Sequence, residues 1–192
     1  MKLSHTRHRV AAAAAAVALP LSLAATAPQA WAASAGDPFG PGCASLPKEG
    51  PGSPAAMAGQ PVAAAAAGNP ALSTLSSAVQ QAGLVDTLDT AEGITVFAPT
   101  DEAFAKIPKA ELDKLLADKA ALTDILTYHV VGTTVGKPDL ADGSFETLEG
   151  STLTTAGSGD AYEVNDTAAI VCGDVATSNA TVHVVDTVLM PQ

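Results

Sequence analysis

Outside the N-terminal region, two histidines are the residues of this sequence best suited to catalysis or metal binding. His129 closes the Tyr-His pair that begins at Tyr128, and His183 lies three residues before Asp186. A catalytic imidazole works with a nucleophile or a metal, but the sequence has neither a Gly-x-Ser-x-Gly elbow nor a cysteine cluster. On a strand, side chains three positions apart point to opposite faces, so His183 and Asp186 do not form a metal pair. The sequence therefore predicts no catalytic residue and no metal site.

The remaining polar motifs are typical of turns. Asp160, Asn165 and Asp166 offer oxygens that calcium prefers, but they lack the spacing of an EF-hand loop. Asn165 and Asn179 each begin an Asn-x-Thr glycosylation sequon, and we interpret both as ordinary turn residues. The sequence also contains no glycine-rich phosphate loop and no dinucleotide fingerprint, so it predicts no cofactor and no enzyme.

His129 has a structural interpretation that competes with the catalytic one. It follows Ile125 by four residues, so both lie on the apolar face of a predicted helix, while Asp124 and Tyr128 lie together on its flank. A buried imidazole requires a partner for each ring nitrogen. We favour a buried polar brace at the point where the helix passes into Val130-Val131, with a His129-dependent hydrolase as the alternative.

Helical and strand patterns divide the folded region into two parts. Apolar residues at helical spacing predict helices early in the chain, at 61–67, 71–82, 109–117 and 119–128. Another short helix is predicted between its cap Thr100 and Pro108, and two short β-rich stretches predict strands near 84–88 and 94–98. From 130 to 190, alternating residues between turn signals predict about five antiparallel strands. Helices followed by strands indicate an α+β domain.

Residues 1–35 have the organisation of a secretory signal peptide. A basic start at 2–9 precedes an apolar run at 10–19, and small residues continue to Ala32 and Ala35. The apolar run is too short to span a bilayer. We therefore expect cleavage after Ala32 or Ala35, a secreted extracellular protein and no membrane span.

The two cysteines suit an oxidising compartment. Segment 36–53 is rich in glycine and proline and is predicted to be an irregular arm, followed by one compact domain over 54–192. Cys43 and Cys172 are the only cysteines, and in a secreted chain they are expected to pair, which would tether the arm. Two free thiols or a shared metal are the alternatives.

Charge limits the class of partner. After signal removal the chain retains six lysines, no arginine and twenty acidic residues, a net charge of −14. Such a surface repels phosphate backbones and anionic headgroups, so we expect no nucleic-acid partner. We also expect a monomer.

Three stretches of this sequence resemble the fasciclin domain. "GITVFAPTDEAFAKIP" at 93–108 and "ATVHVVDTVLMP" at 180–191 are similar to the two conserved boxes of the family, and "LTDILTYHVVG" at 122–132 is similar to its Tyr-His motif. The matching positions that we interpret as structural are Thr95, Phe97, Pro99, Thr100, Phe104, His129, Val188, Leu189 and Pro191. The cysteine placement also resembles that of secreted single-domain mycobacterial fasciclin antigens, and the likeness to periostin and keratoepithelin is more distant.

This resemblance implies both a fold and a class of function. The implied fold is a wedge in which a small antiparallel β-sandwich or bent sheet packs beside several short helices. The implied function is a non-enzymatic adhesion module for a protein, cell-surface or matrix ligand, and the candidate contacts are Asp124, Ile125 and Tyr128. Leu122 and Thr123 replace the polar pair of the family's integrin-type motif. The alternative function is a carrier of a small apolar or lipid ligand.

Overall fold

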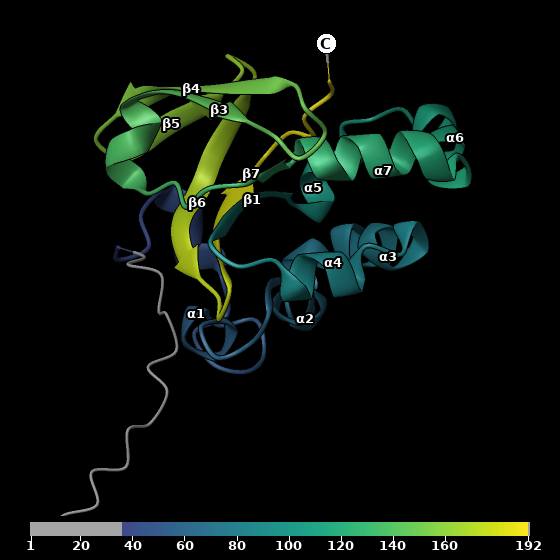
Figure 1. Cartoon of the computed structure of the whole chain (residues 1–192). Coiled ribbons are helices and arrows are strands. Elements are labelled where there is room, and N and C mark those ends of the chain that lie inside the picture. Colours follow the sequence, from purple (N-terminus) through teal and green to yellow (C-terminus); the bar gives the residue numbers. More distant parts are fainter. Residues whose placement is uncertain (1–35, 192) are drawn as a thin grey trace, which may run out of the picture.

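Most helices precede most strands along the described chain, although one strand lies among the helices (Figure 1). The computed structural model describes residues 36–191, so the predicted signal peptide and both of its candidate cleavage sites, Ala32 and Ala35, lie outside the described residues. The α-helices are α1 Pro54–Met57, α2 Val62–Gly68, α3 Ser73–Ala82, α4 Val85–Thr90, α5 Asp101–Ala105, α6 Lys109–Ala117 and α7 Lys119–Tyr128. Three short 3-10 helices are η1 Pro41–Ser45, η2 Pro70–Leu72 and η3 Lys137–Ala141. The strands are β1 Ile94–Pro99, β2 Val130–Val131, β3 Asp142–Glu146, β4 Thr152–Ser158, β5 Ala161–Val164, β6 Ala168–Ala176 and β7 Ala180–Val185. The predicted α+β class is confirmed.

Local capping explains why the helices begin and end where they do. The Thr100 hydroxyl accepts a hydrogen bond from the amide of Ala103 at 3.2 Å, as its position before an acidic first turn predicts. Asp118 caps α7 in the same way. Gly83 ends α3 with a φ of 76°, a left-handed conformation that glycine adopts without steric cost. Within residues 36–191, no helix has the length and apolar character needed to cross a membrane.

The predicted strand near 84–88 is wrong, because this segment forms helix α4. The valine and threonines of "LVDTLDT" favour a strand locally, but Leu84 and Leu88 also have helical spacing. The amide of Leu88 donates to the carbonyl of Leu84 at 2.9 Å, and Leu88 is buried in the helical core. Tertiary burial at a four-residue period therefore outweighs the strand propensity of the β-branched residues.

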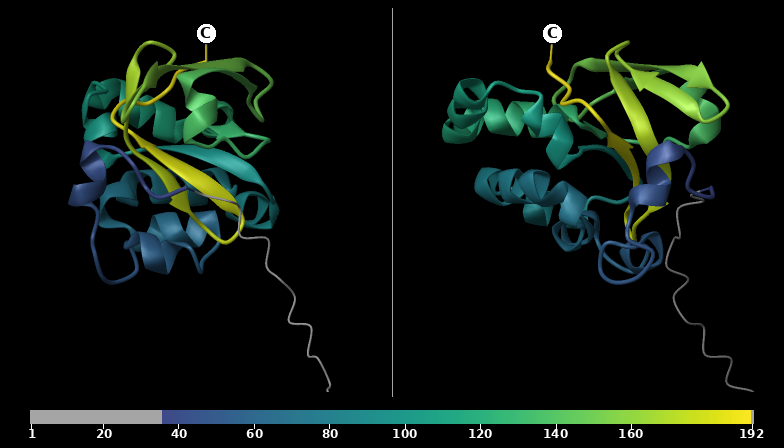
Figure 2. Two further views of the ribbon diagram at one scale, coloured as in Figure 1. Left: turned by 90° about the vertical axis from the view of Figure 1, so that its left-hand side faces the viewer. Right: turned by 180° about the vertical axis from the view of Figure 1, so that it is seen from behind.

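The strands form one seven-stranded mixed sheet that nearly closes into a barrel (Figure 2). The strand order is β2-β1-β7-β6-β5-β4-β3. A backbone bridge between Val131 and Thr147 brings β2 close to the end of β3, so the two edge strands lie close together. The sheet is mixed rather than purely antiparallel, since β1 enters from the helical half and pairs in parallel with β7.

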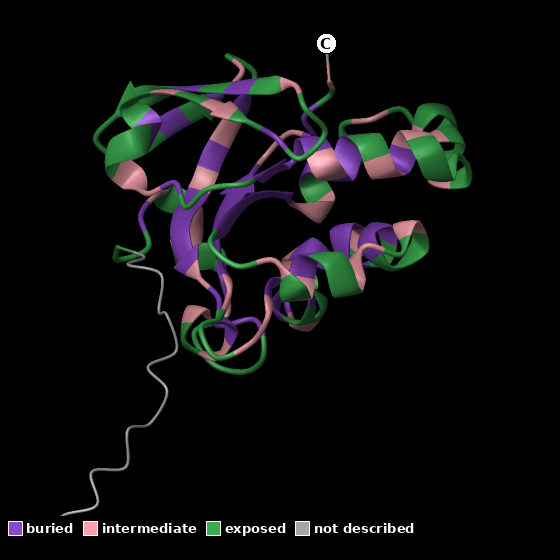
Figure 3. Ribbon diagram, viewed as in Figure 1, coloured by how far each residue is buried: buried purple, intermediate pink, exposed green. Residues whose placement is uncertain are grey.

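Strand β1 separates two hydrophobic cores, and Figure 3 shows it buried along its length. Ile94 and Val96 belong to the helical core, which lies between the sheet and the helices, whereas Phe97 belongs to the barrel core inside the curved sheet. Successive strand residues point to opposite faces, so alternate positions of β1 serve different cores. A strand buried on both faces is almost continuously apolar, as the segment "ITVFAP" is.

The N-terminal segment 36–53 is fastened to strand β6. The amide and carbonyl of Phe39 exchange hydrogen bonds with Gly173 at 3.2 and 2.8 Å, and the Phe39 side chain is buried. Cys43 and Cys172 form a disulfide, which confirms the predicted pairing over a sequence separation of 129 residues. A covalent bond therefore holds this segment on the sheet four residues after Phe39.

Removing the disulfide should weaken the whole domain. The Cys43→Ala/Cys172→Ala variant should lose about 2–5 kcal/mol of unfolding free energy, because the bond no longer restricts the unfolded chain. Urea unfolding followed by circular dichroism would measure the loss, with the exposed η1 substitution Ser45→Ala as control. A loss below about 1 kcal/mol would show that the long loop contributes little entropy.

Candidate functional site

His129 joins the end of α7 to the chain beyond β7. The ring is only 2% exposed. Its Nδ1 lies 2.8 Å from the carbonyl oxygen of Ile125, and its Nε2 accepts a hydrogen bond from the amide of Leu189 at 3.0 Å. Because an amide can only donate, Nε2 is the acceptor and Nδ1 carries the hydrogen that Ile125 accepts. Both ring nitrogens are therefore bonded to backbone groups.

Burial also fixes the charge of His129. Loss of water around the ring lowers the pKa of His129 to about 4, although the hydrogen bond to Ile125 acts in the opposite direction. The imidazole is therefore neutral at physiological pH. A neutral ring without a free nitrogen cannot act as a general base or ligate a metal while these hydrogen bonds persist.

His183 has the same kind of environment on strand β7. It is fully buried, its Nδ1 accepts from the amide of Asp174 at 3.2 Å, and its Nε2 lies 2.9 Å from the carbonyl oxygen of Val135. Its ring also packs on Phe97 with centroids 5.3 Å apart. Because Nδ1 accepts from an amide, it carries no proton, and this second imidazole is also a neutral brace. Burial lowers the pKa of His183 as well, against the opposite effects of Val135 and Asp174.

The first conserved box connects its neighbours through a buried threonine. The Thr95 hydroxyl donates to the carbonyl of Thr133 at 2.7 Å and accepts from the amide of Val135 at 2.8 Å. The side chains of Phe97 and Phe104 fill the barrel core and the helical core. The remaining box residues lie at the end of β1, at the cap of α5 and in the segment after β7: Pro99, Thr100, Val188, Leu189 and Pro191.

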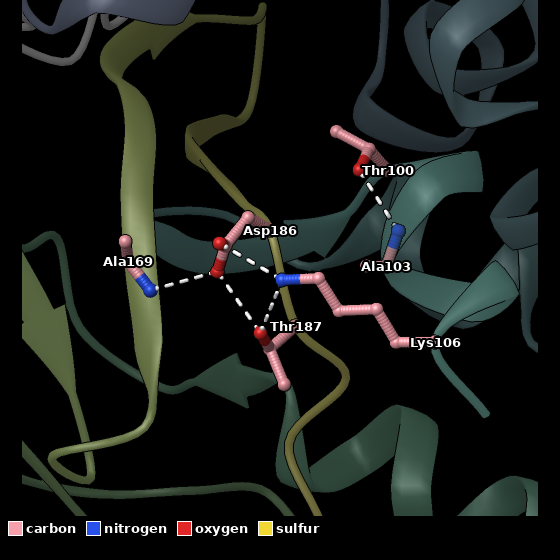
Figure 4. Close-up of polar contacts among 6 residues, drawn as sticks. All are labelled: Thr100, Ala103, Lys106, Ala169, Asp186 and Thr187. Atoms are coloured by element: carbon pink, nitrogen blue, oxygen red, sulfur yellow. Dashed lines mark hydrogen bonds and ion pairs between the residues drawn. The ribbon is translucent and has the colours of Figure 1, made fainter.

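A surface ion pair fastens the end of α5 to the middle of the second box (Figure 4). Lys106 Nζ lies 3.0 Å from Asp186 Oδ2, and the amide of Ala169 donates to Asp186 Oδ1 at 2.9 Å. Partial burial raises the pKa of Asp186, but the hydrogen bonds from Lys106, Ala169 and Thr187 outweigh this effect and hold it below its ordinary value. The second box therefore braces α5, β6 and β7 at one point.

The three predicted contact residues do not share an exposed surface. Asp124 is exposed on α7, whereas Ile125 is buried in the helical core and Tyr128 in the barrel core. The Tyr128 hydroxyl accepts from Asn165 Nδ2 at 2.8 Å, under strands β4 and β5. At its C-terminal end α7 is covered on two sides, so the flank that contains Tyr128 is buried. Only Asp124 remains available to a partner.

Asn179 connects distant segments through side-chain hydrogen bonds, a role that the sequence did not predict. Its Nδ2 donates to the carbonyls of Leu88 and Ala91, both at 2.7 Å, and its Oδ1 accepts from the amide of Val62 at 2.9 Å. It thus ties α2 and α4 to the turn between β6 and β7. An Asn-x-Thr sequence indicates a turn or a glycosylation acceptor, and nothing local reveals partners about a hundred residues away.

An apolar pocket opens between the helices and β1. Its volume is about 190 Å³, and it is lined mainly by aliphatic side chains of α2, α3 and α4, with Leu126 of α7 and His129 also at its wall. Both nitrogens of this histidine are used elsewhere, so the ring offers the pocket no free donor or acceptor. The pocket can therefore hold a small apolar group but has few groups to orient a polar one.

Acidic and histidine side chains do not converge on a metal-binding arrangement in the described part of the chain. No group of three or more His, Cys, Asp or Glu residues within 36–191 has suitable geometry. Both cysteine sulfurs are consumed by the disulfide.

Acid should destabilise the fold through His129. Below pH 6.5 the unfolded chain binds a proton at this residue, whereas the folded protein stays neutral until about pH 4. Stability is therefore complete above pH 6.5 and is lost as the pH falls towards 4, by about 3 kcal/mol for this residue.

The substitution His129→Gln keeps a donor and an acceptor but cannot titrate. Its unfolding free energy should fall about 3 kcal/mol less than that of the wild type between pH 7 and pH 4. Denaturant unfolding at a series of pH values would measure the difference, and His183, which titrates in both proteins, cancels from it. Equal pH dependence of the two proteins would contradict a neutral, buried His129.

Comparison with known proteins agrees with this geometry. The model of the fasciclin domain matches residues 70–191. The cell surface glycolipoprotein MPB83 of Mycobacterium bovis is 49% identical over 170 residues, which cover 84% of this chain and 76% of that protein. The immunogenic protein MPB70 of the same species is 44% identical over 167 residues, covering 83% of this chain and 85% of that protein.

A solved structure shows the same fold at low identity. The FAS1 domain pair from the insect cell adhesion molecule Fasciclin I aligns with a TM-score of 0.58 at 19% identity. The alignment covers 71% of this chain and 52% of that one, so the chain spans about half of the domain pair. The family match extends over most of the described residues and includes both boxes and the Tyr-His motif. This chain belongs to the fasciclin domain family.

Proposed function

We propose that this chain is a secreted, non-enzymatic interaction module that binds an extracellular protein, cell-surface or envelope partner. The main observation is that both histidines of the described chain are neutral, buried and bonded to backbone groups through both ring nitrogens. The fold therefore uses its most reactive side chains as internal braces. Relatives named as a cell surface glycolipoprotein and as a cell adhesion molecule support the same class of function.

The contact surface that we propose lies on the outer face of α7. Asp124 is exposed there, and Ala121 lies three residues earlier on the same face. Ala121, Ile107 and Leu115 line a shallow depression together with Met190, whose side chain is 45% exposed. Acids outnumber the single lysine among the charged residues that also line this depression, which are Glu111, Lys114 and Asp118. Together with the exposed Asp124 carboxylate, the surface suits a partner that presents a basic group next to an apolar side chain.

Replacing Asp124 should weaken binding without affecting the fold. Asp124→Ala should reduce binding to isolated envelope or cell-surface fractions of the producing organism about 3–5-fold at low salt, since an exposed charge pair contributes up to about 1 kcal/mol. Biolayer interferometry at several salt concentrations would measure the change, with the exposed Asp142→Ala on β3 as matched control. Met190→Ser tests the apolar part of the same surface. If both surface variants bind like the control, the proposed contact surface is wrong.

A second candidate function is the transport of a small apolar ligand. The observation that favours it is the aliphatic pocket of about 190 Å³ beside His129. An engineered apolar cavity of roughly 150 Å³ binds benzene, so this pocket has room for a small ring or the end of an alkyl chain. A complete lipid needs more space, because typical pockets for drug-sized ligands begin at about 300 Å³.

Native mass spectrometry of protein secreted by its own host would test this second function. A bound ligand should appear as a mass adduct on the wild type, and Ala66→Met should remove it by filling the pocket wall. Ala117→Met makes the same change at an exposed position of α6 and should keep the adduct. A wild type without an adduct under gentle conditions would count against a carrier.

A further inference from the structure

Asp174 is a buried acid with an incomplete set of partners. It lies in an irregular part of β6, with a left-handed φ of 54°, and is only 3% exposed. Its Oδ2 accepts from the amide of Lys137 at 3.2 Å, whereas its Oδ1 is buried without a hydrogen-bond partner among the described residues. A buried carboxylate with so few partners is destabilising, and a nearby cation at either oxygen would stabilise its charge.

The nearest cationic side chain of the described chain serves another acid. Lys137 Nζ lies 2.6 Å from Asp160 Oδ1 and 4.7 Å from the centre of the Phe39 ring. His183 receives the Asp174 amide at Nδ1, and its Nε2 lies at hydrogen-bond distance from the carbonyl oxygen of Val135. Neither side chain therefore donates to the free oxygen of Asp174.

Gly36 lies directly beside this carboxylate. A Cβ atom built on Gly36 would be 3.0 Å from Asp174 Oδ2 and 3.9 Å from its carboxyl carbon. The following residues hold Gly36 in this position, since Phe39 is bonded to Gly173 and Cys43 to Cys172. The start of the described chain is thus placed against Oδ2 of a buried acid that has no cationic partner among the described side chains.

We propose that signal peptidase cleaves after Ala35 and that the α-ammonium group of Gly36 then forms an ion pair with the Asp174 carboxylate. Hydrolysis of the Ala35–Gly36 peptide bond adds water and gives a carboxylate on the leaving peptide and an ammonium group on Gly36. Asp174 is the docking site for this new cation. Signal removal therefore supplies a cation to this buried carboxylate on the side of Oδ2, the oxygen that faces Gly36.

The geometry of a terminal glycine permits this pairing. The nitrogen and the built Cβ occupy neighbouring tetrahedral positions on the same Cα, about 2.5 Å apart. Once the preceding peptide is gone, rotation about the Cα–C bond can move the nitrogen into the Cβ position. That position is 3.0 Å from Oδ2, a hydrogen-bond distance for a charged donor and acceptor.

The pairing also distinguishes between the two cleavage sites. Cleavage after Ala32 leaves three extra residues before Gly36, which move the new amine up to about 10 Å along an extended chain. The pairing therefore requires cleavage after Ala35.

Secretion of the full chain is the first test. Intact mass and N-terminal sequencing of protein from the culture medium should show a start at Gly36. A secreted chain that starts at Ala33, or at any residue other than Gly36, would overturn the proposal.

The second test is a cycle of four proteins produced with defined starts. Chains that start at Gly36 or at Ala33 are each made with Asp174 and with Asp174→Asn, which retains an acceptor for the Lys137 amide but has no charge. The Gly36 start should melt about 3–6 °C above the Ala33 start when Asp174 is present. The two starts should melt at the same temperature when Asp174→Asn has removed the charged partner. In the Asp37→Asn control, which neutralises an exposed neighbouring acid, the difference between the two starts should persist.

A direct readout is the pKa of the terminal amine by NMR of Gly36. An α-amino group ordinarily titrates near about 7.7–8.0, and in the Gly36-start protein its pKa should rise by about one unit or more. The Asp174→Asn protein should return it to the ordinary range, whereas Asp37→Asn should not. Lys137, Asp160, Tyr162 and His183 surround the site and are unchanged in all these proteins. An ordinary amine pKa in the wild type, or equal melting of both starts, would refute the ion pair.

Discussion

The imidazole of His129 is the contact on which the two halves of this molecule depend. It receives a backbone amide from the segment after β7 and lies at hydrogen-bond distance from a carbonyl in the last turn of α7. The next residue, Val130, begins β2, which pairs with β1. The ring is thus bonded to α7 and to the segment after β7, and the chain continues directly from it into the sheet. Since β1 of this sheet lies between the helical core and the barrel core, the ring fixes the helix, the sheet and the C-terminal segment relative to each other. An aliphatic residue of similar size could fill the space but would leave the Leu189 amide without an acceptor.

Local chemistry allowed much of the fold to be predicted from the sequence. The Thr100 cap, the Gly83 terminator and the alternation of β4 and β5 all act over a few residues, so pattern and propensity suffice. Segment 84–88 shows the limit, since its strand propensity and its helical spacing conflict and only burial decides between them. The parallel pairing of β1 with β7 is similarly invisible locally, because it joins segments more than eighty residues apart.

The candidate site was less predictable for the same reason. That a buried His129 needs two partners follows from its position on an apolar face, but the identity of Leu189 as the distant donor does not. The helical wheel places Tyr128 beside Asp124, yet it cannot show that strands β4 and β5 cover one of them. Asn179 satisfies amides and carbonyls of two helices from a turn, and no sequence pattern encodes that arrangement.

The distribution of charge explains why the start of the mature chain matters. The mature chain that we propose has twenty acids and six lysines, and two of these lysines form ion pairs, with Asp186 and with Asp160. Both pairs are partly exposed, where a bond between charges contributes little. Asp174 is the buried acid, and at such a site a partner has the greatest effect, because little water remains to solvate the charge. A terminal ammonium group has no side chain to order and is held there by the backbone bonds of Phe39 and by the disulfide. In the mature chain that we propose, the disulfide that fastens segment 36–53 thus also positions the ammonium group of Gly36.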